Sequence, residues 1–168
     1  DLSKAVVLVR KKADEFRIAP NRLFICGFSA GGHLCGSLGV HYKSKELLLD
    51  GKWANISNRP DGMILSYPVI SSGEYAHKGS FHALLGMNPT FDELEYMSLE
   101  KQITKDTPPA FIWHTETDDA VPVENSYLFA QGCKRHGVEY ELHVFRKGMR
   151  NGQKGIMMVI IRWNSFTI

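Results

Sequence analysis

Residues 23–33 read Leu23-Phe24-Ile25-Cys26-Gly27-Phe28-Ser29-Ala30-Gly31-Gly32-His33. Their apolar beginning predicts a buried strand, and the small apolar residues that continue to Val40 predict a helix packed close beneath it. A G-x-S-x-G sequence between a strand and a helix is typical of a nucleophile elbow, a tight turn that presents one serine hydroxyl. We predict that Gly27 and Gly31 give Ser29 the room for this turn, because side chains there would clash. The alternative interpretation is an ordinary glycine-rich turn.

Other apolar runs place this turn within an alternating series of strands and helices. The further elements that we predict are strands at residues 61–68, 110–114 and 138–145, and helices at residues 2–16 and 122–135. An irregular insertion, residues 71–103, separates the second strand from the third. Strands that alternate with helices form parallel sheets, because each connection must cross back over the sheet. The sequence therefore predicts an α/β fold, a three-layer α/β/α sandwich around a partial, mainly parallel sheet.

The composition fits a single domain with a core of its own, since 168 residues are enough for one. The 20 basic and 18 acidic side chains are spread along the chain, so we expect neither nucleic acid nor a membrane surface as a partner. The longest apolar run, Ile156 to Ile161, is too short to cross a bilayer.

The cysteines and the first residue bear on the cellular compartment. We expect Cys26, Cys35 and Cys133 to be buried free thiols, which favours a reducing, cytoplasmic location over a disulfide framework. No signal peptide is visible, but the chain begins with Asp1 rather than Met, so we expect a missing upstream segment.

Two aspartates follow the third predicted strand, where the acid of a catalytic triad is expected. Asp118 and Asp119 lie between that strand and the helix that Pro122 opens. In folds that present a serine on such an elbow, the order along the chain is serine, acid, histidine. A single aspartate before a helix is also typical of an N-cap or of a solvated loop charge, and we prefer that role for Asp119.

Several stretches together resemble the α/β-hydrolase superfamily, in its branch of carbohydrate acetylesterases and dienelactone-hydrolase-like serine esterases. The matching stretches are Gly27 to Leu34, Tyr67 to Ile70 with Ser72-Gly73-Glu74, Trp113-His114-Thr115, and Asp118-x-x-Val121-Pro122-Val123-Glu124-Asn125-Ser126. The elbow combined with the Asp-x-x-Val-Pro segment is far more specific than either motif alone. The resemblance implies an α/β-hydrolase fold with Ser29 as the nucleophile, the Ala30 N–H as an oxyanion donor and Asp118 as the triad acid.

The chain departs from this family pattern in its histidine, its tail and its oxyanion hole. The family places its catalytic histidine in a Phe-x-x-Gly-x-His-Gly sequence, and Arg150 occupies that position here. A guanidinium group cannot accept a proton near neutral pH. We therefore divide the chain into a partial α/β-hydrolase domain, residues 1–152, and an atypical tail, residues 153–168, for which we hypothesise a shifted reading frame. We expect the family's second oxyanion donor, from a His-Gly-Gly-type loop, upstream of Asp1.

The remaining histidines predict neither a replacement base nor a metal site. We expect His33 and His114 to form structural hydrogen bonds, and His143 to lie on the surface of the last strand. His77 and His82 are five residues apart, and no ligand set accompanies them. The sequence therefore predicts no metal and no cofactor.

These observations predict a serine esterase that hydrolyses carboxylic esters, acetyl esters on carbohydrate above all, through an acyl-serine intermediate. The expected partner is a small-molecule ester. Two alternatives stay open. The chain is a catalytically inactive fragment or pseudo-enzyme, because of Arg150, or it is a serine peptidase, because one fold serves several acyl substrates.

Overall fold

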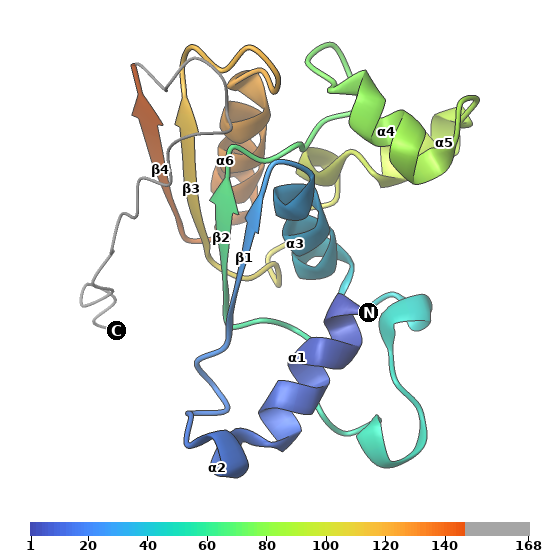
Figure 1. Cartoon of the computed structure of the whole chain (residues 1–168), viewed down its shortest axis with the longest axis vertical. Helices are drawn as coiled ribbons and strands as arrows, with labels where there is room; N and C mark the ends of the chain where they lie inside the picture. The colour runs from blue at the N-terminus through green and yellow to red at the C-terminus, as the bar shows by residue number, and fades with distance from the viewer. Residues whose placement is uncertain (147–168) are drawn as a thin grey trace.

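Four parallel strands form one sheet in the order β1-β2-β3-β4 in the computed structural model, which describes residues 1–146 (Figure 1). The strands are β1 (Phe24–Phe28), β2 (Gly62–Ser66), β3 (Ala110–Thr115) and β4 (Tyr140–Phe145). Ile25 pairs with Met63, and Met63 pairs with Ala110, so neighbouring strands are in register across the sheet. The parallel sheet and its strand positions confirm the sequence prediction. Because all four strands run the same way, their carboxyl ends share one edge of the sheet.

Helices connect the strands at the positions that the sequence predicts, with one break. The helices are α1 (Leu2–Lys11), α2 (Ala13–Phe16), α3 (Ala30–His41), α4 (Lys78–Leu85), α5 (Phe91–Tyr96) and α6 (Glu124–His136), and short 3-10 turns lie at Lys45–Leu47, Gly51–Trp53 and Leu99–Lys101. The predicted helix over residues 2–16 divides at Lys12. Past this break Ala13 is still buried, whereas Phe16 at the end of α2 is exposed.

One face of the sheet carries the core, and α3 and α6 pack on it (Figure 1). Leu65 and Ile112 project from this face and are fully buried together with Phe129 of α6. Burying a side chain of this size stabilises the fold by about 1.5–3 kcal/mol. The structure is thus the predicted partial α/β sandwich, with two of its three layers within residues 1–146.

The opposite face of the sheet is exposed along β1, although Phe111 of β3, on the same face, is buried. The side chains of Phe24, Cys26 and Phe28 on β1 are exposed there. The prediction that all three cysteines are buried is therefore wrong for Cys26, although Cys35 and Cys133 are buried. Cys26 faces away from α3, so only a third layer of the sandwich would cover it.

Asn125 forms hydrogen bonds to the segment that connects β2 to the insertion. Its side chain, on α6, is fully buried. Its Oδ1 accepts hydrogen bonds of 2.9 Å from the backbone N–H groups of Ile70 and Ser71. Its Nδ2 donates to the carbonyl oxygens of Tyr75, at 2.9 Å, and Pro122, at 3.0 Å. This one amide therefore fixes the path of the chain where it leaves β2 and enters the insertion.

Replacing Asn125 with leucine should lower the free energy of unfolding by about 3 kcal/mol or more, because each buried backbone group left unpaired costs about 1–3 kcal/mol. Urea unfolding followed by circular dichroism measures the change. Gln131→Leu provides the control, since Gln131 is exposed on the same helix and its replacement should shift stability by no more than about 0.5 kcal/mol. Equal effects of the two substitutions would contradict the role of Asn125.

Candidate active site

Ser29 occupies the sharp turn between β1 and α3, with φ of 53° and ψ of −119°. A positive φ is strained for a residue with a side chain and costs about 1–3 kcal/mol. Backbone hydrogen bonds hold the conformation: Ser29 N–H donates to the Ser66 carbonyl at 3.0 Å, and the Ser29 carbonyl accepts from Val69 N–H and His33 N–H, each at 3.2 Å. The turn has the strand-elbow-helix geometry that the sequence predicts.

The glycines around Ser29 differ in how much space a side chain would have at each position. A Cβ on Gly27 would overlap the backbone carbonyl of Gly31 and would lie 2.8 Å from Cys35 Sγ. A Cβ on Gly31 would meet no atom within 4 Å in the described part of the chain, so the predicted clash at Gly31 is wrong. Gly32 takes that role instead, since a Cβ there would lie 2.7 Å from Pro68 Cβ. The need for glycine at position 32 was not predicted from the sequence, where the only indication is that Gly32 directly follows Gly31.

Ala30 is the first residue of α3, directly after Ser29. The N–H groups in the first turn of a helix have no acceptor within the helix, and the helix dipole makes this end electropositive. The Ala30 N–H is therefore placed to donate to an oxygen that gains negative charge beside the serine.

Asp118 lies in the loop after β3 and is held by backbone N–H groups. Its Oδ1 accepts hydrogen bonds from Ala120 N–H at 2.9 Å and Val121 N–H at 3.0 Å. Its Oδ2 accepts no hydrogen bond from residues 1–146, and the side chain is 18% exposed. One carboxylate oxygen thus fixes the side chain and the other is free to orient a base. Asp119 is an exposed loop residue.

His114, on β3, forms a hydrogen bond to the loop that carries Asp118. The His114 Nε2 lies 3.0 Å from the Val121 carbonyl oxygen, which can only accept, so Nε2 carries the hydrogen. The Ser126 hydroxyl then donates to Nδ1 at 2.7 Å. Burial lowers the pKa of His114, although the Val121 carbonyl and the Asp118 carboxylate act in the opposite direction. This imidazole is a neutral structural group, as predicted, and its Nε2 lies 3.6 Å from Asp118 Oδ2.

Ser29 and Asp118 follow β1 and β3, so both lie at the carboxyl edge of the sheet (Figure 1). The predicted site residue Arg150 lies outside the described residues, as does the predicted tail, residues 153–168. His143 is exposed on β4, as predicted, and its Nε2 lies 3.2 Å from Glu141 Oε2. Residues 1–146 contain no group of three potential metal ligands. Within the same residues, no helix combines the length and the hydropathy of a membrane span.

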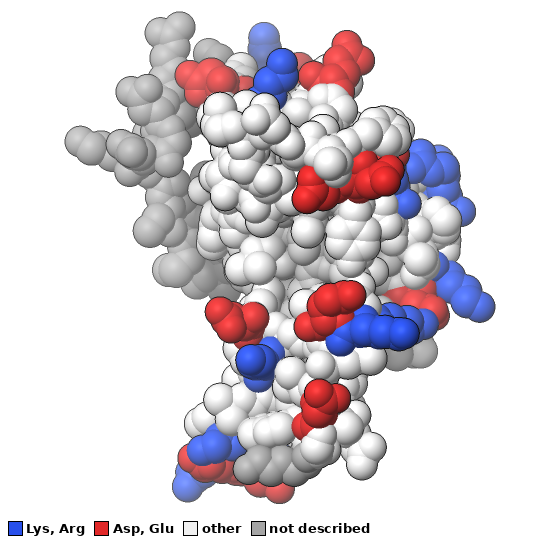
Figure 2. Space-filling model, turned by 90° about the vertical axis from the view of Figure 1, so that its right-hand side faces the viewer, with Lys and Arg blue, Asp and Glu red and all other residues white. Residues whose placement is uncertain are grey.

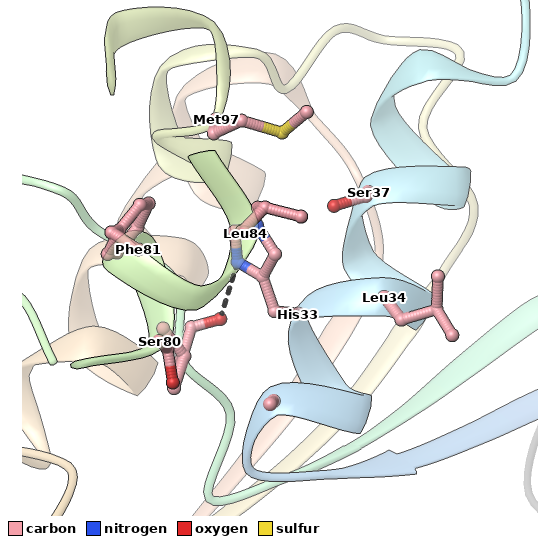
Figure 3. A pocket seen from close by; sticks show the side chains of 9 residues that line it. His33, Leu34, Ser37, Ser80, Phe81, Leu84 and Met97 are labelled. Atoms are coloured by element: carbon pink, nitrogen blue, oxygen red, sulfur yellow. Dashed lines mark hydrogen bonds between the residues drawn. The ribbon is translucent and has the colours of Figure 1, made fainter. Parts of the chain in front are cut away.

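A cavity of about 240 Å³ lies between α3 and the insertion (Figure 3). Its lining is mainly hydrocarbon and consists of Ala30, His33, Leu34, Ser37, Val69, Ser80, Phe81, Leu84 and Met97. Ala30, the residue of the expected oxyanion donor, is therefore one of the residues that line this cavity.

One family model matches most of this chain. The model of the family named BD-FAE matches residues 1–132. This chain belongs to the BD-FAE family. As a BD-FAE protein it is an α/β-hydrolase, which confirms the resemblance found in the sequence.

Two curated proteins resemble this BD-FAE chain in sequence. An endo-1,4-beta-xylanase B of Butyrivibrio fibrisolvens is 51% identical over 148 residues, which are 88% of this chain and 23% of the relative. An acetylxylan esterase of Xylanibacter ruminicola is 31% identical over 153 residues, which cover 88% of this chain and 29% of the relative. The chain therefore spans about a quarter of the length of each of these relatives.

Solved structures share the fold of this BD-FAE chain. An acetyl ester-xyloside bifunctional hydrolase from Caldicellulosiruptor lactoaceticus superposes with a TM-score of 0.82 and 46% identity, covering 88% of this chain and 54% of its own. The carboxylesterase Cest-2923 from Lactobacillus plantarum superposes with a TM-score of 0.71 and 26% identity, covering 88% and 52%. Residues of this chain thus correspond to about half of each solved structure.

Proposed function

We propose that this BD-FAE chain hydrolyses carboxylic esters on carbohydrate, with Ser29 as the nucleophile and Asp118 as the acid of its triad. The observation that carries the proposal is the strained backbone of Ser29, φ 53°, directly before the Ala30 N–H. Backbone strain of this kind is typical of functional sites. Here it presents a serine hydroxyl beside a backbone N–H group that can stabilise an oxyanion, and an acyl-transfer site needs both groups. The relatives support the substrate class, since their names include an acetylxylan esterase and an acetyl ester-xyloside hydrolase.

In this mechanism the hydroxyl oxygen of Ser29 attacks the ester carbonyl carbon, and a general base takes the hydroxyl proton. The family pattern assigns this base to a histidine, whose position Arg150 occupies in this chain. The Ala30 N–H donates to the carbonyl oxygen as it becomes an oxyanion. The base then gives its proton to the ester oxygen of the sugar as the bond from that oxygen to the carbonyl carbon breaks. The sugar leaves as an alcohol, and an acetyl group stays on Ser29. Water attacks this acyl-enzyme by the same route and releases acetate. Asp118 uses Oδ2 to orient the base, since its Oδ1 already accepts two backbone hydrogen bonds.

The release of acetate from acetylated xylo-oligosaccharides tests the proposal. Proton NMR should show acetate appearing in proportion to the protein added, and a peptide of matched length should remain uncleaved. Cleavage of the peptide without release of acetate would favour a serine peptidase and contradict the proposal. The matched comparison is needed because the fold alone does not determine the acyl substrate.

An inactive chain is the second candidate, and Arg150 favours it. Arginine stands at the position of the family's histidine and cannot take the proton from Ser29. Under this alternative the chain releases no acetate, and Arg150→His restores the release. Acetate release by the unmodified chain would contradict the inactive alternative.

A further inference from the structure

Asp118 belongs to a short turn, residues 118–121, that its own carboxylate closes. Oδ1 accepts the N–H groups of Ala120 and Val121, two and three residues further along the chain, which is typical of an Asx turn. These bonds fix the carboxylate relative to the turn. They do not fix the turn relative to the sheet, so its position at the carboxyl edge depends on further contacts.

In the described part of the chain, two hydrogen bonds join this turn to β3. At the start of the turn, the Asp118 N–H donates to the Thr115 carbonyl oxygen at 3.2 Å. At its far end, His114 Nε2 lies 3.0 Å from the Val121 carbonyl oxygen. The His114 side chain is fully buried, and a hydrogen bond shielded from water is stronger than an exposed one. His114 thus supplies the hydrogen bond that holds the far end of the turn.

This hydrogen bond requires the imidazole hydrogen to be on Nε2, because the Val121 carbonyl can only accept. A neutral imidazole has only one such hydrogen, so its Nδ1 needs a donor. Ser126 on α6 supplies it, since its fully buried hydroxyl lies 2.7 Å from Nδ1. The hydrogen bond at one ring nitrogen decides whether the other nitrogen carries the hydrogen. The Ser126 hydroxyl therefore selects the form of His114 that donates to Val121.

The other neutral form of the ring would repel the turn. With its hydrogen on Nδ1, His114 would direct the Nε2 lone pair at the Val121 carbonyl oxygen. The same lone pair would face Asp118 Oδ2, which is 3.6 Å from Nε2. All three atoms would carry negative charge, so they would repel one another. The position of Oδ2, the oxygen that the proposed mechanism uses, thus depends on the hydrogen of this ring.

His114 is neutral near pH 7, as this arrangement requires. Burial lowers its pKa, although the Val121 carbonyl and the carboxylates of Asp118 and Glu124 oppose this effect. Elsewhere on the surface, acidic and basic side chains are interspersed, as Figure 2 shows for one side of the molecule. Exposed charges are screened over about 10 Å, so such a mixture exerts little field on a buried ring.

We propose that Ser126 and His114 are positioning residues for Asp118. The Ser126 hydroxyl keeps the hydrogen of His114 on Nε2, and this N–H holds the turn that carries Asp118 against the sheet. Their role in catalysis rests on the proposed function in one respect, the assignment of Asp118 as the triad acid. A fully buried hydroxyl on α6 then determines how well this acid is placed.

The form of the ring can be measured on the unmodified chain. NMR spectra that correlate ring protons with ring nitrogens distinguish an imidazole with its hydrogen on Nε2 from one with its hydrogen on Nδ1. Near neutral pH we expect His114 in the Nε2–H form. A ring with its hydrogen on Nδ1, or a charged ring, would overturn the proposal, and this result does not depend on the folding of any variant.

Hydrogen exchange of the Val121 amide measures how firmly the turn is held, because this N–H is bonded to Asp118 and exchanges when the turn opens. Ser126→Ala leaves His114 Nδ1 without its donor. The Val121 exchange rate should therefore rise about 5- to 100-fold, the effect of one buried group left unpaired.

Ser3→Ala is the matched control for this exchange experiment. Ser3 is also buried and also donates a hydrogen bond, to the Leu47 carbonyl oxygen at 2.6 Å. It lies on α1, at the opposite end of the molecule from the carboxyl edge of the sheet (Figure 1). Ser3→Ala should change the Val121 exchange rate by less than about 2-fold. Equal rates in Ser3→Ala and Ser126→Ala would overturn the proposal.

His114→Gln tests whether Ser126 acts through the ring. A glutamine amide can donate to the Val121 carbonyl and has no ring hydrogen to relocate. In a His114→Gln background, Ser126→Ala should therefore change the Val121 exchange rate by less than about 2-fold. A change as large as in the unmodified background would show that Ser126 acts on the turn directly, and the proposed route through His114 would be wrong.

The kinetics of ester hydrolysis should show the same dependence. The triad acid orients the base and makes no contact that binds the ester, so its displacement affects turnover. Ser126→Ala should lower kcat for acetate release about 5-fold or more and change KM by less than about 2-fold. A loss confined to KM would contradict a positioning role.

The NMR and exchange measurements need no catalysis, so they separate this proposal from the proposed function. If the Val121 amide responds as expected and the chain releases no acetate, the positioning of the turn stands and the proposed esterase fails. If acetate is released and the Val121 amide does not respond to Ser126→Ala, the esterase stands and the positioning role fails.

Discussion

Ser29→Ala is expected to reduce the hydrolysis of 4-nitrophenyl acetate by this chain to the rate measured in buffer. The substitution removes the oxygen that forms the acyl intermediate, while the elbow, held by backbone hydrogen bonds to Ser66 and Val69, persists. In subtilisin, removal of the catalytic serine lowers turnover by roughly a millionfold. Liberated nitrophenolate, followed by absorbance, measures the rate.

Ser57→Ala is the control for this experiment. Ser57 is exposed in the loop before β2, away from the carboxyl edge of the sheet. Its replacement should leave the rate unchanged. Retention of more than a tenth of the original rate by Ser29→Ala would show that hydrolysis occurs at another group, and the mechanism would be wrong.

Gly27→Ala is expected to destabilise the fold severely, by about 3 kcal/mol or more, because its Cβ meets backbone that cannot retreat. The obstructing atom is the carbonyl oxygen of Gly31, which belongs to the first turn of α3. Moving it would break the turn that presents Ser29. Urea unfolding measures the loss, and a fall in ester hydrolysis should accompany it.

Gly31→Ala provides a matched comparison, since both glycines flank the same serine. The Cβ of Gly31 would stand in open space in the described structure. Alanine is also favoured over glycine in a helix, by up to about 1 kcal/mol. Gly31→Ala should therefore leave stability unchanged or raise it slightly. Equal destabilisation by the two substitutions would contradict the observed difference between these positions.

The order of strands and helices could be predicted from the sequence because apolar runs and turn residues follow local rules. The parallel sheet, the elbow at Ser29 and the positions of β2 and β3 all depend on such local patterns. The break at Lys12 could not be predicted in this way. An apolar period of the right length indicates a helix but does not show where its axis changes.

Contacts between distant segments limited the prediction of the site. Gly31 and Gly32 are adjacent in sequence, but only Gly32 lies against Pro68, a residue that follows a different strand. The same limit applies to His33, whose role depends on Val69 and Phe81. The exposure of Cys26 depends on whether a third layer covers its face of the sheet. Sequence patterns do not contain these distances.

Asp118 and Asp119 differ both in the family pattern and in their structural surroundings. The sequence alone left Asp118 and Asp119 as candidates, and the resemblance favoured Asp118. The structure adds a physical difference between them. Asp118 is held by two backbone N–H groups with one oxygen free, whereas Asp119 is an exposed loop residue. Preorganisation of this kind is what orients a base without cost during the reaction.

The site at which a fluorophosphonate probe reacts, determined by mass spectrometry of the digested protein, shows most directly whether Ser29 is the nucleophile. The unmodified chain and Arg150→His are treated in parallel, with Ser29→Ala as the blank. We predict one adduct, on the peptide that contains Ser29, formed faster in Arg150→His and absent from Ser29→Ala. An adduct on any other residue, or no adduct on Ser29 in either protein, would contradict the assignment of Ser29 as the nucleophile.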